Sequence, residues 1–87
     1  MKTFKDLEFK PHSISNGLQA VMNFDNNYGV SVVKLNGSYG FHQDLWEVAI
    51  LYKGSLTYNT DITDDVIGHQ TDEDVTEVMK KVQMLND

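Results

Sequence analysis

Seven acidic side chains within residues 61–77 are the groups in this sequence with the clearest capacity for chemistry, and no Lys or Arg lies among them. Carboxylates at this density could bind a divalent cation, act as general acids and bases, or attract a basic surface. Residues 59–87 contain eight acids against two lysines, whereas residues 1–58 contain five of each. The formal net charge of −6 therefore arises in the last third of the chain.

A calcium-binding loop is the first chemistry to test against these acids. Asp61, Thr63 and Asp65 occupy positions one, three and five of a twelve-residue window. The EF-hand loop requires Gly at position six and a bidentate Glu at position twelve, and this chain has Val66 and Asp72 there. We therefore predict no metal site and no cofactor, and interpret the acids as helix-capping and first-turn residues.

The histidines His12, His42 and His69 could meet at a metal ion, and His42 with Asp44 could form a general-base pair. None of the three has ligand spacing, and all lie in segments predicted to be loops. The chain has no cysteine, which excludes disulfides and thiolate sites. Its serines and glycines match neither a nucleophile elbow nor a phosphate-binding loop. We therefore expect no enzymatic activity.

A second candidate site is the loop segment that contains Tyr39, Phe41 and His42. Exposed aromatic side chains are frequent anchors of interfaces, and rings beside an imidazole could also stack on and hydrogen-bond to a base. A platform for single-stranded nucleic acid would need a basic groove, and this chain is acidic. We therefore predict no direct binding of nucleic acid.

The spacing of the apolar residues, which has a period of two in the first part of the chain and of 3.6 near its end, predicts the strands and the helix that position these residues. The fold class is α+β: a three- to four-stranded antiparallel meander packed against one C-terminal amphipathic helix. Residues 1–87 form a single small domain, in which residues 18–59 form the sheet. Alternating apolar residues and turn formers predict the strands over residues 18–24, 30–35, 45–52 and 55–59.

After the sheet, the apolar period changes from two to 3.6 and predicts a helix over residues 72–85, with Thr71 as its N-cap. Thr63, two aspartates and Gly68 repeat this pattern and predict a short helical turn over residues 63–67. Residues 1–15 show no sustained period, so we expect an extended arm or an edge strand at residues 8–10.

The helix carries one apolar stripe, which we expect to cover one face of the sheet. The stripe consists of Val75, Val78, Met79, Val82 and Leu85. The sheet face is predicted to consist of Leu18, Ala20, Met22, Val48 and Ile50.

The opposite sheet face would present Leu45, Ala49 and Leu51 to solvent. One helix cannot cover both faces, so we predict a homodimer formed through a sheet face or edge. In a monomer, the N-terminal arm with Phe4, Leu7 and Phe9 would have to cover this second face.

Two stretches of this sequence occur together in a known group of proteins. Residues 24–33 read FDNNYGVSVV, and residues 58–68 read YNTDITDDVIG and continue into TDEDV at residues 71–75. Together they resemble short uncharacterised proteins encoded by bacteriophages and prophages. The likeness covers about a third of the chain, and His69-Gln70 stand where that group has an aromatic–aliphatic pair. The resemblance implies a phage accessory protein in the cytoplasm of a bacterial host.

The charge segregation and the resemblance predict a non-enzymatic protein that binds and inhibits a host or phage protein with a basic surface. The residues predicted to dock are Asp64, Asp65, Asp72, Glu73 and Asp74. The alternative is a protein that binds or sequesters a nucleotide-like signal in a pocket at an oligomer interface, with Tyr39, Phe41 and His42 as contacts. No apolar run reaches the roughly 18–20 residues of a membrane span, so we expect no membrane contact.

Overall fold

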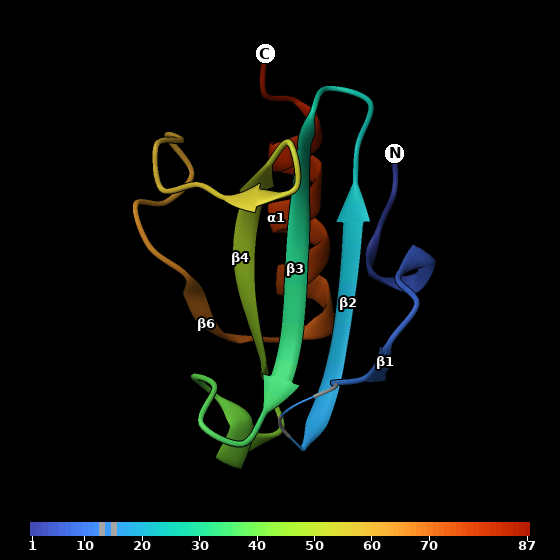
Figure 1. The fold of residues 1–87 in the computed structure, drawn as a ribbon, viewed down its shortest axis with the longest axis vertical. Helices are drawn as coiled ribbons and strands as arrows, with labels where there is room; N and C mark the ends of the chain where they lie inside the picture. Colours follow the sequence, from blue (N-terminus) through green and yellow to red (C-terminus); the bar gives the residue numbers. More distant parts are fainter. Residues whose placement is uncertain (13, 15) are drawn as a thin grey trace.

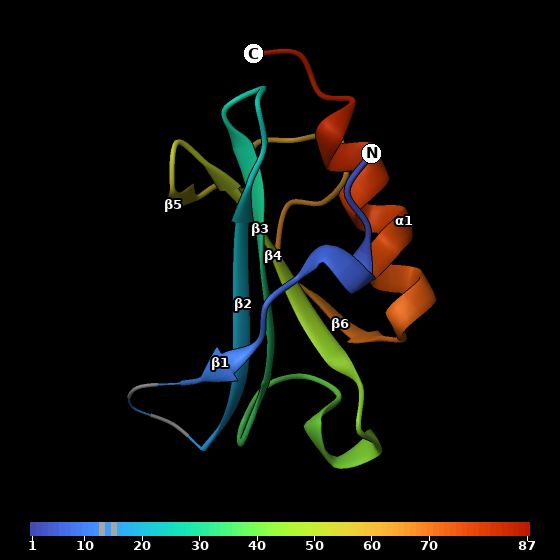
Figure 2. The same ribbon diagram turned by 90° about the vertical axis from the view of Figure 1, so that its right-hand side faces the viewer.

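An antiparallel sheet with one α-helix against it forms the fold in the computed structural model, which describes residues 1–12, 14 and 16–87 (Figures 1 and 2). Two short 3₁₀ turns, η1 (Phe4–Asp6) and η2 (Phe41–Gln43), precede the sheet and its fourth strand. The strands and the helix are β1 (Lys10–Pro11), β2 (Gly17–Asn23), β3 (Tyr28–Leu35), β4 (Trp46–Tyr52), β5 (Ser55–Leu56), β6 (Ile67–Gln70) and α1 (Asp72–Gln83).

The described strands follow the order β1-β2-β3-β4-β5, and β6 also pairs with β4. This arrangement confirms the α+β class, the antiparallel sheet and the C-terminal helix. The predicted number of three to four strands is too small, because β1 and β6 each add a short strand. The edge strand expected at residues 8–10 lies at Lys10–Pro11, and residues 13 and 15 of the predicted arm lie outside the described residues.

The helical turn predicted over residues 63–67 is wrong. The Thr63 hydroxyl accepts a hydrogen bond from the Asp65 N–H at 3.1 Å and donates to the Asp65 carbonyl at 3.0 Å, so it closes a local turn. Gly68 does not end a helix, because it lies within β6. A threonine before two aspartates serves equally as a helix cap and as a side-chain turn. Pairing of Ile67 with Val48 on β4 decides between the two.

The helix begins where the sequence predicted. The Thr71 hydroxyl accepts from the Asp74 N–H at 3.1 Å, and the Asp74 carboxylate accepts from the Thr71 N–H at 3.1 Å, which completes a capping box. The helix ends at Gln83, two residues before the predicted end. There the Asn26 amide, in the β2–β3 turn, donates to the carbonyls of Val82 and Leu85 at 2.9 Å each. A distant side chain thus binds carbonyls at the helix end, where the regular intrahelical bonds stop.

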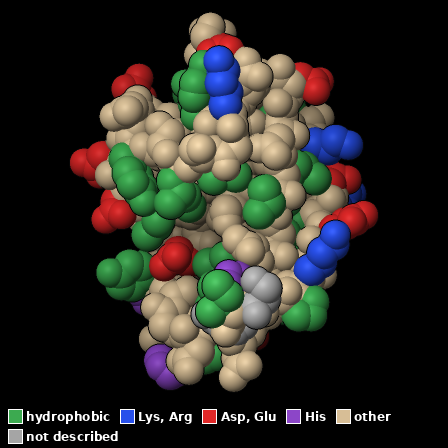
Figure 3. Space-filling view, viewed as in Figure 1, with side chains coloured by type: hydrophobic (Ala, Val, Ile, Leu, Met, Phe, Trp, Pro, Cys, Tyr) green, Lys and Arg blue, Asp and Glu red, His purple; other side chains and the backbone are tan. Residues whose placement is uncertain are grey.

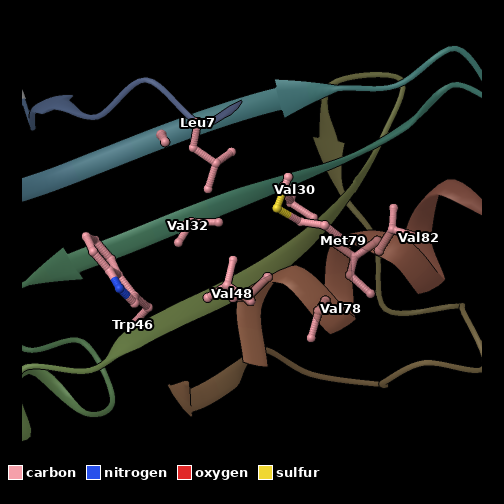
Figure 4. Packing of buried hydrophobic residues seen from close by; sticks show 11 residues of the cluster. Leu7, Val30, Val32, Trp46, Val48, Val78, Met79 and Val82 are labelled. Carbon is pink, nitrogen blue, oxygen red and sulfur yellow. The ribbon is translucent and has the colours of Figure 1, made fainter. Parts of the chain in front are cut away.

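The helix and one sheet face enclose the core (Figure 4). Val75, Met79 and Val82 of the predicted stripe are 0% exposed. Leu18, which was expected on this face, is 40% exposed and therefore outside the core. The sheet residues at most 2% exposed are Ala20, Val30, Val32, Val48 and Ile50.

The N-terminal arm packs on the same side of the sheet as the helix (Figure 2). The Phe9 ring stacks on the Trp46 ring with centroids 4.4 Å apart, and the Phe4 N–H donates to the Thr76 hydroxyl at 3.0 Å. Leu7 is buried in the same cluster. The arm therefore does not cover the second sheet face, contrary to what a monomer was expected to require.

Candidate functional site

The sheet face opposite the helix forms a groove, which we call the open face. One row of residues across it consists of Val21, Ser31 and Ala49, which face one another across β2, β3 and β4. These residues alternate with the core residues, so the period of two that buries Ala20 directs Val21 outward. The groove has a volume of about 430 Å³. Its lining residues are His12, Gln19, Val21, Ser31, Val33, Leu35, Glu47, Ala49, Leu51, Gly54, Leu56 and Val66.

The floor of the groove is nearly buried, whereas its rims are exposed. Val33 and Leu51 on the floor are 9% and 6% exposed, while Val21 and Leu56 on the rims are 54% and 57% exposed. β5 turns onto this side of the sheet, away from the helix (Figure 2). Figure 3, which views this side, shows hydrophobic side chains over its left and centre. The apolar rims are therefore available to a partner.

Polar groups within the groove are bonded to other groups of the protein. The Gln19 side-chain amide donates to the Ser31 hydroxyl at 3.1 Å. The Glu47 carboxylate accepts from the Tyr39 N–H at 3.0 Å. The groove therefore offers an apolar surface with one fixed negative charge at its border.

The loop that contains Asp64 and Asp65 borders this groove, because Val66 is one of its lining residues. We call residues 61–65 the acidic loop. The Asp65 carboxylate accepts from the Val66 N–H at 2.7 Å, which holds that side chain close to the groove wall. Asp64 is exposed. Figure 3 shows acidic side chains along the left margin of this face, beside hydrophobic ones.

The acids predicted at the helix N-terminus lie apart from the acidic loop, at the other end of β6 (Figure 1). The Asp72 carboxylate accepts from the Trp46 indole N–H at 2.8 Å. Asp74 completes the capping box, and Glu73 is exposed. The five acids predicted to dock thus form two groups, and Asp72 and Asp74 have identified structural roles.

Tyr39, Phe41 and His42 lie in the connection between β3 and β4. Tyr39 is 62% exposed, and its Cβ lies so close to Gly68 that a Cβ added at residue 68 would be 2.4 Å away. The rings of Phe41 and His42 meet edge to face, with centroids 5.6 Å apart. None of these three residues lines the groove of the open face.

The acidic loop is not neutralised by lysine. Among the described residues, ion pairs join Lys34 to Asp44 at 2.9 Å and Lys80 to Glu77 at 3.4 Å, and neither pair involves the loop. The described residues contain no group of three or more His, Cys, Asp or Glu side chains arranged to hold a metal ion. No helix in the described part of the chain is long and apolar enough to cross a membrane.

Sequence reasoning identified the acids Asp64 and Asp65 and placed Ala49 and Leu51 on the second sheet face, but it did not predict that this face forms a groove beside the acids. Val21 could have been added from its alternation with core residues, because its parity places it opposite the helix. Leu56 and Val66 could not, because they reach the groove only through the path of β5 and the acidic loop. Comparisons with family models, with curated proteins and with solved structures gave no match for this chain.

Proposed function

We propose that this protein is a non-enzymatic binding protein that docks on a host or phage protein and inhibits it. The groove of the open face takes apolar side chains of the partner, and the acidic loop pairs with its basic side chains. The phage context is the one that the sequence resemblance implies. The observation that carries the proposal is the position of Asp64 and Asp65 beside Val66, at the wall of an apolar groove.

The arrangement supports this function because it combines the two parts of a typical protein interface. An apolar centre supplies most of the binding free energy, and a charged rim directs the encounter and selects the partner. Leu56 supplies exposed apolar surface at the groove, and Asp64 is exposed beside it without an ion pair in the described part of the chain. A segment of alternating apolar and basic residues has the complementary chemistry.

The proposal is tested by co-purification from phage-infected bacteria with tagged variants of equal helicity. The wild-type protein is compared with Asp64→Asn/Asp65→Asn, with Leu56→Asp, and with Glu73→Gln as a control that removes an acidic charge away from the groove. We expect a basic protein to be retained by the wild type and by the control, and lost with the other two variants. Its retention should fall as salt rises, because rim charges are screened. Retention by all four proteins with equal salt sensitivity would contradict the proposal.

One observation favours a second function, the binding of a nucleotide-like small molecule at an oligomer interface. Tyr39 is 62% exposed, and the same loop contains Phe41 and His42, whose rings contact each other. Such rings could stack on a base. Native mass spectrometry of protein from infected and uninfected cells tests this function: a bound small molecule lost in Tyr39→Ala would support it, and the bare chain mass in both samples would exclude it.

A further inference from the structure

The outer edge of β2 is only partly covered by β1. β1 pairs with Gln19 and Leu18 and then ends, so residues 20–23 have no strand partner on that side among the described residues. We call these residues the free edge. The arm upstream of β1 turns toward the helix, where Phe9 stacks on Trp46. An uncovered edge of this kind exposes backbone donors and acceptors to another strand.

The hydrogen-bond pattern identifies which backbone groups are available. The His12 N–H donates to the Gly17 carbonyl at 3.0 Å, so the odd-numbered residues of β2 direct their backbone groups toward the β1 side. The Phe24 N–H donates to the Tyr28 carbonyl at 2.7 Å, so the even-numbered residues pair with β3. By this alternation, the N–H and carbonyl groups of Val21 and Asn23 point outward along the free edge.

Space on both sides of the free edge would accommodate an added strand. A hollow of about 340 Å³ lies against Val21 and Gln19, next to β1. A second hollow of about 500 Å³ lies between Met22 and Asn23 on one side and Met1 and Lys2 of the N-terminal arm on the other. Side chains of a strand point alternately to the two faces of a sheet, so a strand at this edge needs room on both.

We propose that a second copy of this chain occupies the free edge, with β2 of one copy antiparallel to β2 of the other. The exposed charges at the two ends of the edge support this occupant. Lys10 lies level with Gln19 at one end, and Asp25 lies two residues beyond Asn23 at the other. Antiparallel pairing about a two-fold axis brings Lys10 of each copy to Asp25 of the partner copy.

This pairing keeps the acidic loops of the two copies apart. The acidic loop and β6 lie at the opposite edge of the sheet from β2 (Figure 1). Two copies joined through β2 would therefore form one continuous sheet with the like-charged loops at its far ends. The open faces of both copies would lie beside each other and stay accessible.

Sedimentation equilibrium over a range of protein and salt concentrations tests the proposal. We expect the wild type to approach twice the chain mass of 9.9 kDa as its concentration rises. Lys10→Glu and Asp25→Lys should each weaken dimerisation about tenfold, because each creates two like-charged contacts. The double variant with both changes should restore the wild-type affinity. A single species of 9.9 kDa at every concentration would overturn the proposal.

Val21→Pro provides a variant specific for the edge, because it removes an outward N–H and leaves the bonds between β2 and β3 in place. It should remain folded by circular dichroism and become monomeric. Hydrogen exchange supplies an independent measurement on the wild type: the amides of Val21 and Asn23 should exchange slowly only at concentrations where the dimer forms. A folded Val21→Pro protein that still dimerises would show that another surface joins the copies, and would overturn the proposal.

Discussion

Ala20 and Val21 are neighbours in β2, yet Ala20 is 2% exposed and Val21 is 54% exposed. The difference arises because a continuous helix and the N-terminal arm cover the first face of the sheet, whereas in the described part of the chain β5, the acidic loop and His12 border the second. On the core side, an apolar cluster is closed by the helix and the arm, and hydrogen bonds such as that from the Trp46 indole to Asp72 join these elements at its border. On the open face, apolar residues lie beside carboxylates without lysine partners. A surface of that composition is suited to binding, and the covered face is suited to stability.

The strongest test of this contrast places the same charge on each face. Val75→Asp introduces a carboxylate at a position that is 0% exposed, with no cation in the core cluster to pair with it. We expect it to reduce the free energy of unfolding by about 4 kcal/mol or more. Leu56→Asp, on the exposed rim of the groove, should change it by less than about 1 kcal/mol. Urea denaturation followed by circular dichroism measures both, and equal effects would contradict the contrast.

A smaller effect on the free energy of unfolding is expected for a substitution of Trp46, at which the N-terminal arm contacts the core side of the sheet. Trp46→Phe keeps an aromatic ring against Phe9 but removes the indole N–H that donates to Asp72. We expect a loss of about 1–3 kcal/mol in the free energy of unfolding, because the bond reaches a charged acceptor. A double-mutant cycle with Asp72→Ala isolates this bond, and Tyr39→Phe is the control for an exposed ring. Additive effects of the two changes would show that the bond contributes nothing.

On the open face, the hydrogen bond between Gln19 and Ser31 is the counterpart of the Trp46–Asp72 bond, and its loss should have a smaller effect on stability. Ser31→Ala removes the hydroxyl that accepts from Gln19, and solvent can replace this partner at the groove surface. The expected loss in the free energy of unfolding is about 0.5–1 kcal/mol. Thermal and urea denaturation of the single variants and of Gln19→Ala/Ser31→Ala measure it. A loss as large as that of Trp46→Phe would mean that the open face is as important for stability as the core side.

The smallest expected effect depends on pH and arises at the last residue. Hydrogen bonds from the Tyr52 hydroxyl and the Asn27 amide to the Asp87 carboxylate lower the pKa of Asp87 below 3.8. A lowered pKa contributes stability that is present above 3.8 and is lost as the pH falls through the folded-state value. Asp87→Asn should therefore flatten the acid end of the stability profile.

Tyr52, which donates this hydrogen bond, should give a pH dependence of stability with the opposite sign at alkaline pH. The hydrogen bond to Asp87 raises the pKa of Tyr52 above 10.0. This contribution is present below 10.0 and is lost as the pH rises through the folded-state value. Melting temperatures of the wild type, Asp87→Asn and Tyr52→Phe across the pH range measure the acid and the alkaline ends of the stability profile. Profiles of identical shape for all three proteins would exclude the contact in solution.

The long elements could be predicted because their patterns are local and extend over many residues. The alternation around Ala20 and the helical stripe through Val75 each repeat several times, and Thr71 with Asp74 marks the helix start. The strand β6 could not be predicted, since four residues that include Gly68 and His69 have little strand propensity. Those residues extend because β4 pairs with them. The turn at Thr63 was predicted wrongly as a helical turn, because a threonine before two aspartates suits either local structure and the pairing of the following residues with β4 decides between them.

The sequence of this protein by itself determined the α+β class, the two faces of the central strands, the helix N-cap and the acidic last third. These features depend on periodicity, capping and charge, which are properties of residues close together in the chain. Only the tertiary structure decided that the N-terminal arm joins the helix side, that Asn26 binds carbonyls at the helix end, and that Val66 brings the acidic loop to a groove. Each of these depends on contacts between residues far apart in the chain. Their positions follow from the packing of the whole sheet, which no local pattern encodes.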